Sequence, residues 1–291
     1  MVQSLDFITP IVDDAFTFGQ IAAANALSDI FAMNARVTTA LNILGFDDKH
    51  LPKELIKDIL EGGNSKIKEC GGVLLGGHSI CSPEMYYGLS VTGLANPSKI
   101  LRNNTGKIGD LLILTKPLGM GIISTALKNE KLQQAQIKEA CKIMSNLNFH
   151  TSKHMRDFKI SACTDITGFG FLGHAYEMTN DKISLSIDAN LVPCLDLART
   201  WAKKEQIPGG TKRNQDYFGK NISFSQKLQN SNDFAELKAL LFDAQTSGGL
   251  LFSIDKNQAK EFLSKIQDSS LGYAQVIGEI TPRKQKAIML N

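Results

Sequence analysis

Apolar and polar positions follow two different periods along the chain, which predicts that helices and strands alternate. Apolar residues at helical spacing predict a helix over residues 52–70, with Pro52 in its first turn. Short apolar runs or a period-two alternation predict strands over residues 37–44, 86–94, 110–115, 183–187, 249–254 and 274–280. This mixed order of elements is typical of an α/β (α+β) fold with mixed sheets packed with helices.

Small residues dominate residues 16–30, and Asp13 and Asp14 before them are typical of a helix start. We expect this helix to pack closely against a sheet. Further helices are predicted over residues 133–149, 170–178, 234–242 and 257–266, and a loop over residues 207–211. A short strand over residues 71–75 is predicted to run into the loop Gly76-Gly77-His78-Ser79, whose backbone N–H groups could surround a phosphate.

The chain is long enough for two domains. It has 291 residues, and a domain typically has about 150. The polar stretch over residues 97–109 contains Asn103-Asn104-Thr105-Gly106 and marks the boundary. We therefore expect one domain over residues 1–97 and a second over residues 98–291.

Composition excludes several kinds of partner and location. The net charge of +3 is weak and the basic residues are interleaved with acids, so we expect no nucleic-acid partner. No apolar run is long enough to cross a bilayer, and the amino terminus does not resemble a signal peptide, so we expect no membrane partner and a cytoplasmic location. The five cysteines are widely spaced without a C-x-x-C pair, which favours free thiols in a reducing compartment.

Asp165 lies in an unusual run of glycines and hydroxyl residues over residues 163–174. The run contains Gly168-x-Gly170-x-x-Gly173, which formally matches a dinucleotide-binding fingerprint, with Asp188 at the distance expected of a ribose ligand. Three features argue against NAD binding: the preceding strand is poor, a carboxylate there would repel pyrophosphate, and no series of parallel strands leads into the motif.

The alternative interpretation of Asp165 is a metal and phosphate site. Mg²⁺ is usually held by one or two carboxylates together with substrate phosphates. Asp29 follows Asn25 by four residues, so both project from one face of the predicted helix, and Asp6 lies beside a strand. No Walker A motif occurs in the sequence, which excludes a P-loop.

Several motifs together make the chain similar to a known family. They are Asp6-Phe7-x-x-Pro10-Ile11-Val12-Asp13, Asn25-Ala26-Leu27-Ser28-Asp29-Ile30-Phe31-Ala32-Met33, Gly76-Gly77-His78-Ser79, Leu114-Thr115-Lys116-Pro117-Leu118-Gly119, Thr164-Asp165-Ile166-Thr167-Gly168-Phe169-Gly170, Pro208-Gly209-Gly210-Thr211 and Gln245-Thr246-Ser247-Gly248-Gly249-Leu250. In this order they resemble selenophosphate synthetase (selenide, water dikinase), of the AIR-synthetase-like ATP-binding superfamily. The resemblance covers essentially the whole chain.

The resemblance implies a two-domain AIR-synthetase-like fold and a reaction in which ATP, selenide and water give selenophosphate, AMP and phosphate. It implies that Asp29 and Asp165 hold Mg²⁺. The ATP site would be lined by Asp6, Asp29, Gly77, His78 and Ser79. It further implies a homodimer with ATP and selenide as its substrates. For Lys116 and the run over residues 245–250, structural roles are expected.

In the family, a glycine-rich amino-terminal segment carries a reactive cysteine or selenocysteine, a catalytic lysine and a further Mg²⁺-binding aspartate. We find none of these here, and we assign no catalytic residue to this chain. We therefore hypothesise a truncated form with little or no activity. Genomic sequence upstream that lacks an in-frame glycine-rich Cys or UGA segment would contradict this. A sister ATP-dependent ligase or kinase of the superfamily and a non-catalytic nucleotide-binding remnant are the alternatives.

Overall fold

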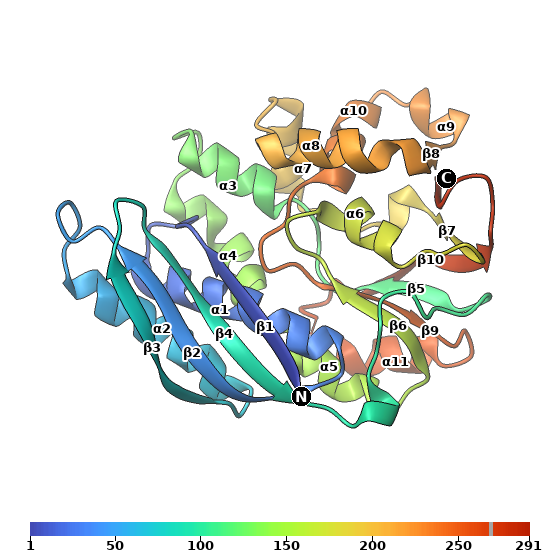
Figure 1. Cartoon of the computed structure of the whole chain (residues 1–291). Helices are drawn as coiled ribbons and strands as arrows, with labels where there is room; N and C mark the ends of the chain where they lie inside the picture. The colour runs from blue at the N-terminus through green and yellow to red at the C-terminus, as the bar shows by residue number, and fades with distance from the viewer. Residues whose placement is uncertain (268–269) are drawn as a thin grey trace. The chain divides into compact units, whose positions relative to one another are not determined.

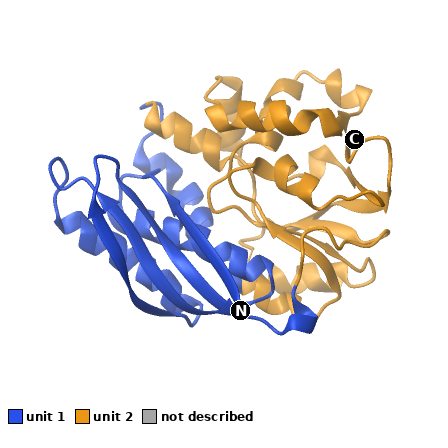
Figure 2. Ribbon diagram, viewed as in Figure 1, with its two compact units in different colours: residues 1–100, 130–149 blue, residues 101–129, 150–291 orange. Residues whose placement is uncertain are grey.

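The computed structural model describes residues 1–267 and 270–291. The chain forms two compact units (Figure 2), one of residues 1–100 and 130–149 and the other of residues 101–129 and 150–291. These units are defined by packing, so the expected domains over residues 1–97 and 98–291 stay a prediction.

The first unit is built on a four-stranded sheet (Figure 1) in the order β1-β4-β2-β3. The strands are β1 (Val2–Ile8), β4 (Tyr86–Leu94), β2 (Arg36–Phe46) and β3 (Val73–Cys81). Only β2 and β3 run parallel. Its helical elements are α1 (Ala15–Ala32), α2 (Glu54–Glu69), η1 (Pro97–Lys99), η2 (Gln134–Ile137) and α4 (Lys138–Ser145). The ring of Phe18 in α1 contacts that of Tyr87 in β4, so α1 covers the face to which Tyr87 points.

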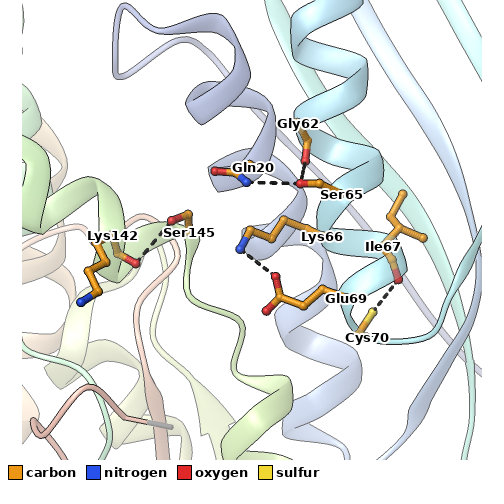
Figure 3. A network of polar contacts seen from close by, with 9 residues as sticks. All are labelled: Gln20, Gly62, Ser65, Lys66, Ile67, Glu69, Cys70, Lys142 and Ser145. Carbon is orange, nitrogen blue, oxygen red and sulfur yellow. Dashed lines mark hydrogen bonds and ion pairs between the residues drawn. The ribbon is translucent and has the colours of Figure 1, made fainter. Parts of the chain in front are cut away.

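Helix α1 begins as its sequence predicts. It packs against β4 of the sheet, as expected, and also closely against α2. The side chain of Asp14 accepts a hydrogen bond from Thr17 N at 2.7 Å and caps the helix. A Cβ atom at Gly19 would lie 2.1 Å from Ile59 O in α2, so only glycine permits this approach of the two helices. Figure 3 shows the polar contact beside it, in which Gln20 Nε2 donates to Ser65 Oγ at 3.2 Å.

The second unit has a seven-stranded sheet in the order β6-β9-β5-β10-β7-β11-β8. The strands are β6 (Ile160–Asp165), β9 (Leu250–Ile254), β5 (Leu111–Leu114), β10 (Gln275–Pro282), β7 (Ile183–Ile187), β11 (Ile288–Leu290) and β8 (Ile222–Phe224). The helical elements are α3 (Met120–Lys128), α5 (Phe149–Met155), α6 (Gly170–Glu177), η3 (Ala189–Leu191), α7 (Asp196–Lys203), α8 (Gly209–Phe218), η4 (Gly219–Asn221), α9 (Gln226–Gln229), α10 (Phe234–Phe242) and α11 (Ala259–Ile266). Figure 1 shows α6, α8 and α10 on one side of this sheet and α11 on the other.

Most predicted elements are confirmed, and three expectations are wrong. The strand expected to end before Gly76 continues through Cys81, because Gly76 and Gly77 adopt φ values of 135° and 150° that let β3 stay paired with β2. The helix expected over residues 133–149 is divided into η2, α4 and the start of α5, because Asn146 is extended and ends α4. The loop expected over residues 207–211 already contains the start of α8.

The sheet order excludes the dinucleotide-binding interpretation of the glycine run. In a Rossmann unit, the two strands that flank the glycine turn are neighbouring parallel strands of one sheet. Here β6 lies at the sheet edge and pairs with β9 antiparallel, while β7 pairs with β10 and β11. Asp188 Oδ1 accepts a hydrogen bond from Asn190 N at 3.0 Å and caps η3. Within the described ranges, no helix is long and apolar enough to cross a membrane.

Candidate functional site

The first unit brings two of the predicted site residues together. Asp6 on β1 and Asp29 on α1 are each held by a neutral donor from the opposite element. Ser4 Oγ donates to Asp29 Oδ2 at 2.6 Å, and Asn25 Nδ2 donates to Asp6 Oδ2. Ser4 and Asp6 are two apart on a strand and Asn25 and Asp29 four apart on a helix, so each pair projects from one face. The expectation that Asn25 and Asp29 share a face is confirmed.

The charges of the two aspartates interact. The pKa of Asp6 is raised to about 6, first by burial and then by the negative charge of Asp29, while hydrogen bonds from Phe7 N and Asn25 oppose the rise. Asp29 is exposed. A cation bound beside Asp29 would offset this repulsion, and carboxylate oxygens are ligands that Mg²⁺ accepts. The pair therefore fits a divalent cation with a phosphate ligand.

Asp165 is the last residue of β6 and is buried, in the second unit. The turn that follows it is tightly held. Gly170 has a φ of 72°, and a Cβ there would lie 2.7 Å from Phe242 O. Thr167 Oγ1 lies 3.2 Å from Nε2 of His174, the side chain of which is buried in α6. Asp165 is thus followed directly by a closely packed turn at the end of a strand.

The predicted nucleotide residues Gly77, His78 and Ser79 lie in β3, at the sheet edge opposite to β1. Gly77 is in register with Asn42, Asn42 with Leu89, and Leu89 with Asp6. Gly77 and Asp6 are therefore three strand spacings apart, which corresponds to about 14 Å between their backbones. Within the chain, these residues and Asp6 are therefore not brought into contact, and their role in nucleotide binding stays a prediction.

Two residues at the sites were missed by the sequence reasoning. Ser4 carried no signal, because a lone serine on a strand has no local pattern. Asp243 is fully buried; burial raises its pKa to about 7, while hydrogen bonds from Ile122 N and the Gln245 side chain oppose the rise. The sequence held no signal for it, because Asp243 caps helix α3, which lies far away in sequence and has no capping side chain of its own.

Four of the five thiols are poor nucleophiles, and the expectation that this chain carries no catalytic residue stays a prediction. All five cysteines are free. Burial is the main cause that raises the pKa of Cys70 and Cys194 to about 11 and raises that of Cys141 and Cys163, so these four stay protonated near neutral pH. Across residues 1–267 and 270–291, no group of three or more His, Cys, Asp or Glu side chains could hold a metal alone.

Two family matches cover nearly the whole chain. Residues 1–95 match the AIR synthase related protein, N-terminal domain, and residues 107–291 match its C-terminal domain. The selenide, water dikinase of Aliarcobacter butzleri (strain RM4018) is 58% identical over all 291 residues and 83% of its own length. That of Campylobacter jejuni (strain NCTC 11168) is 47% identical over the same shares, and that of Clostridium botulinum (strain Eklund 17B) is 43% identical over 82% of its length.

Solved structures of lower sequence identity share the fold. Thiamine-monophosphate kinase from Stenotrophomonas maltophilia superimposes with a TM-score of 0.72 at 19% identity, over 100% of this chain and 84% of that one. The hydrogenase maturation protein HypE superimposes with a TM-score of 0.75 at 13% identity, over 99% and 85%. These likenesses confirm the predicted AIR-synthetase-like fold.

We expect the D6N variant to become more stable relative to the parent as pH rises. Asp6 has a pKa of about 6 in the fold against an ordinary value of 3.8. The folded state therefore holds this proton more tightly, and stability falls as pH rises between these two values. The D6N variant lacks that loss. From pH 4 to pH 7, the difference in free energy of unfolding between D6N and the parent should therefore shift by about 1–2 kcal/mol in favour of D6N, after allowance for solvent screening.

Urea denaturation at both pH values measures this difference. Q3N is the matched control, since it places the same side chain on an exposed polar residue of β1 and leaves Asp6 intact. An equal D6N–parent difference at both pH values would contradict the electrostatic origin of the shift.

Proposed function

Because the chain belongs to the selenide, water dikinase family, we propose that it makes selenophosphate from selenide and ATP with water, releasing AMP and phosphate. The observation that carries the proposal is 58% identity over the full 291 residues to a selenide, water dikinase. The paired carboxylates of Asp6 and Asp29 support it, because phosphoryl transfer depends on positioning and charge neutralisation.

We assign the predicted ligands as follows. Asp29 and Asp165 hold Mg²⁺, and Asp6, Asp29, Gly77, His78 and Ser79 line the ATP site. The metal would neutralise the charge of the transferred phosphoryl groups. Ser4 holds one carboxylate oxygen of Asp29 by donating a hydrogen bond to it. Asn25 does the same for Asp6, and its neutral amide adds no positive charge that would compete with the cation.

Selenide-dependent formation of AMP from ATP is the direct test. Two proteins are compared, the 291-residue chain and the same chain extended at its amino terminus with the corresponding segment of the Aliarcobacter butzleri relative. We expect the extended chain to form AMP only when selenide and Mg²⁺ are present, and the 291-residue chain to form little. In the extended chain, D29N and D165N should each lower the rate by about a hundredfold or more, since metal-assisted charge stabilisation contributes several kcal/mol.

D58N is the matched control for these variants, because Asp58 is an exposed acid of α2. It should keep the parent rate. ATP consumption by the extended chain that is independent of selenide would contradict the proposal and favour a sister ligase or kinase. Binding of ATP without turnover would favour the non-catalytic interpretation, and turnover by the 291-residue chain would show that the added amino-terminal segment is dispensable.

A cytoplasmic location and a homodimer complete the proposal. Free thiols suit a reducing compartment. The support for a dimer is an uncovered apolar sheet face in the first unit. Leu5 and Leu41 are both in register with Ser90, so they share a face, and they are 62% and 45% exposed. The neighbouring strand β3 adds exposed Val73 and Ile80. Apolar residues gathered in this way are typical of a protein–protein interface, and a second copy of the chain is the proposed partner.

A charge on this face should separate the two copies. We expect the parent to sediment as a dimer at micromolar concentration and L41E to sediment as a monomer, because the interface would bury an unpaired carboxylate. K57E, which reverses the charge of an exposed side chain of α2, should stay dimeric. Analytical ultracentrifugation decides, and a monomeric parent would rule the dimer out.

A further inference from the structure

Helix α3 starts without a capping side chain of its own. Its N-cap residue is Gly119, which has a φ of 117° and no side chain. The first N–H groups of a helix have no partner within the helix. Two side chains from a distant segment supply the acceptors. Gln245 Oε1 accepts from Gly119 N and Met120 N at 3.1 and 3.2 Å. Asp243 Oδ2 accepts from Gly121 N and Ile122 N at 3.0 and 3.3 Å.

The two capping side chains are joined to each other and to a second helix. Gln245 Nε2 donates to Asp243 Oδ2 at 2.7 Å and to Asp243 O at 3.0 Å. The other carboxylate oxygen, Oδ1, accepts from Thr211 Oγ1 at 3.3 Å, in the first turn of α8. Both oxygens of this fully buried carboxylate are therefore used within the second unit.

The segment that contains Asp243 and Gln245 also donates hydrogen bonds to the turn that follows Asp165. Gln245 N donates to Thr167 O at 3.2 Å, and Gly248 N donates to Ile166 O at 3.1 Å. From α8, Asn214 Nδ2 donates to Gly168 O at 3.0 Å and to Phe242 O at 3.2 Å. Every carbonyl from Ile166 to Gly168 is thus held either by the segment that contains Asp243 and Gln245 or by α8, which donates to Asp243 through Thr211.

We propose that Asp243 is a positioning residue for Asp165: by capping α3 and binding Thr211, it fixes the segment that holds the turn beginning at Ile166. The proposal rests on the proposed function, in which Asp165 binds the metal. Asp243 touches neither substrate nor metal in this role. It sets the place of a carboxylate at the end of β6, which lies at the edge of the sheet and pairs with β9. The tight approach of Gly170 to Asp243 O, where a Cβ would lie at 2.8 Å, belongs to the same arrangement.

Amide hydrogen exchange in the ligand-free 291-residue chain tests the positioning directly. In D243A, exchange at residues 166–170 and at the first turn of α3 should be faster by about tenfold, because the turn opens locally. D243N keeps an oxygen toward the three donors at Oδ2 and should stay within about threefold of the parent. T211V, which removes one hydroxyl, remains measurable if D243A does not fold, and should accelerate the same residues by about threefold.

F262L is the control for a general loss of stability, since Phe262 is fully buried in α11 and contacts Phe252 and Phe158. It should leave residues 166–170 at the parental rate. If T211V and D243A exchange there no faster than F262L, the proposal is overturned. The amino-terminally extended chain supplies a second readout, in which D243A should raise the Mg²⁺ concentration for half-maximal AMP formation by about tenfold and D243N should restore it.

The two proposals fail in distinguishable ways. An extended chain without selenide-dependent AMP formation contradicts the proposed function, while the exchange data on the ligand-free chain still decide whether Asp243 positions the turn. Faster exchange at residues 166–170 in D243A, together with an unchanged Mg²⁺ requirement, would overturn the positioning role for Asp165.

Discussion

The hydrogen-bonding demand of the first turn of helix α3 is the constraint on which the second unit depends. A glycine at the N-cap cannot meet it, so Asp243 and Gln245 must enter the interior to do so. A buried carboxylate is costly unless several donors surround it. The same donors draw together α3, α8 and the turn after Asp165, so one buried charge organises segments far apart in sequence. The motifs over residues 114–119, 164–170, 208–211 and 245–250 meet around it.

The two carboxylates of the first unit are not fully buried, in contrast to Asp243. Asp6 and Asp29 lie near the surface, and each is bound by a neutral donor, Asn25 and Ser4 respectively. The pKa of Asp6 is raised first by burial, and the negative charge of Asp29 adds to the rise, so their repulsion remains. Such stored repulsion suits a site that is completed by a cation and a phosphorylated ligand. The carboxylate of Asp243, which supports the fold, is therefore surrounded by hydrogen-bond donors. Asp6 and Asp29, which we propose to serve the reaction, keep a repulsion that a cation would offset.

Local patterns predicted what depends on local physics. The period-two alternation over residues 183–187 and the apolar helix over residues 234–242 are confirmed to the residue. The fold and family followed from motif order, which comparison with relatives confirms. Two features depend on tertiary partners and could not be predicted: strand β3 passes through Gly76 and Gly77 because β2 pairs with it, and Asp243 caps a helix more than a hundred residues away in sequence.

The central claim is that the carboxylates beside β1 belong to a metal–nucleotide site. It is tested most directly by titrating Mn²⁺ into the amino-terminally extended chain with a non-hydrolysable ATP analogue, followed by electron paramagnetic resonance. The account predicts that D29N weakens binding of the metal–nucleotide complex by about tenfold or more and that D58N leaves it unchanged. Equal affinities of D29N and the parent would contradict it.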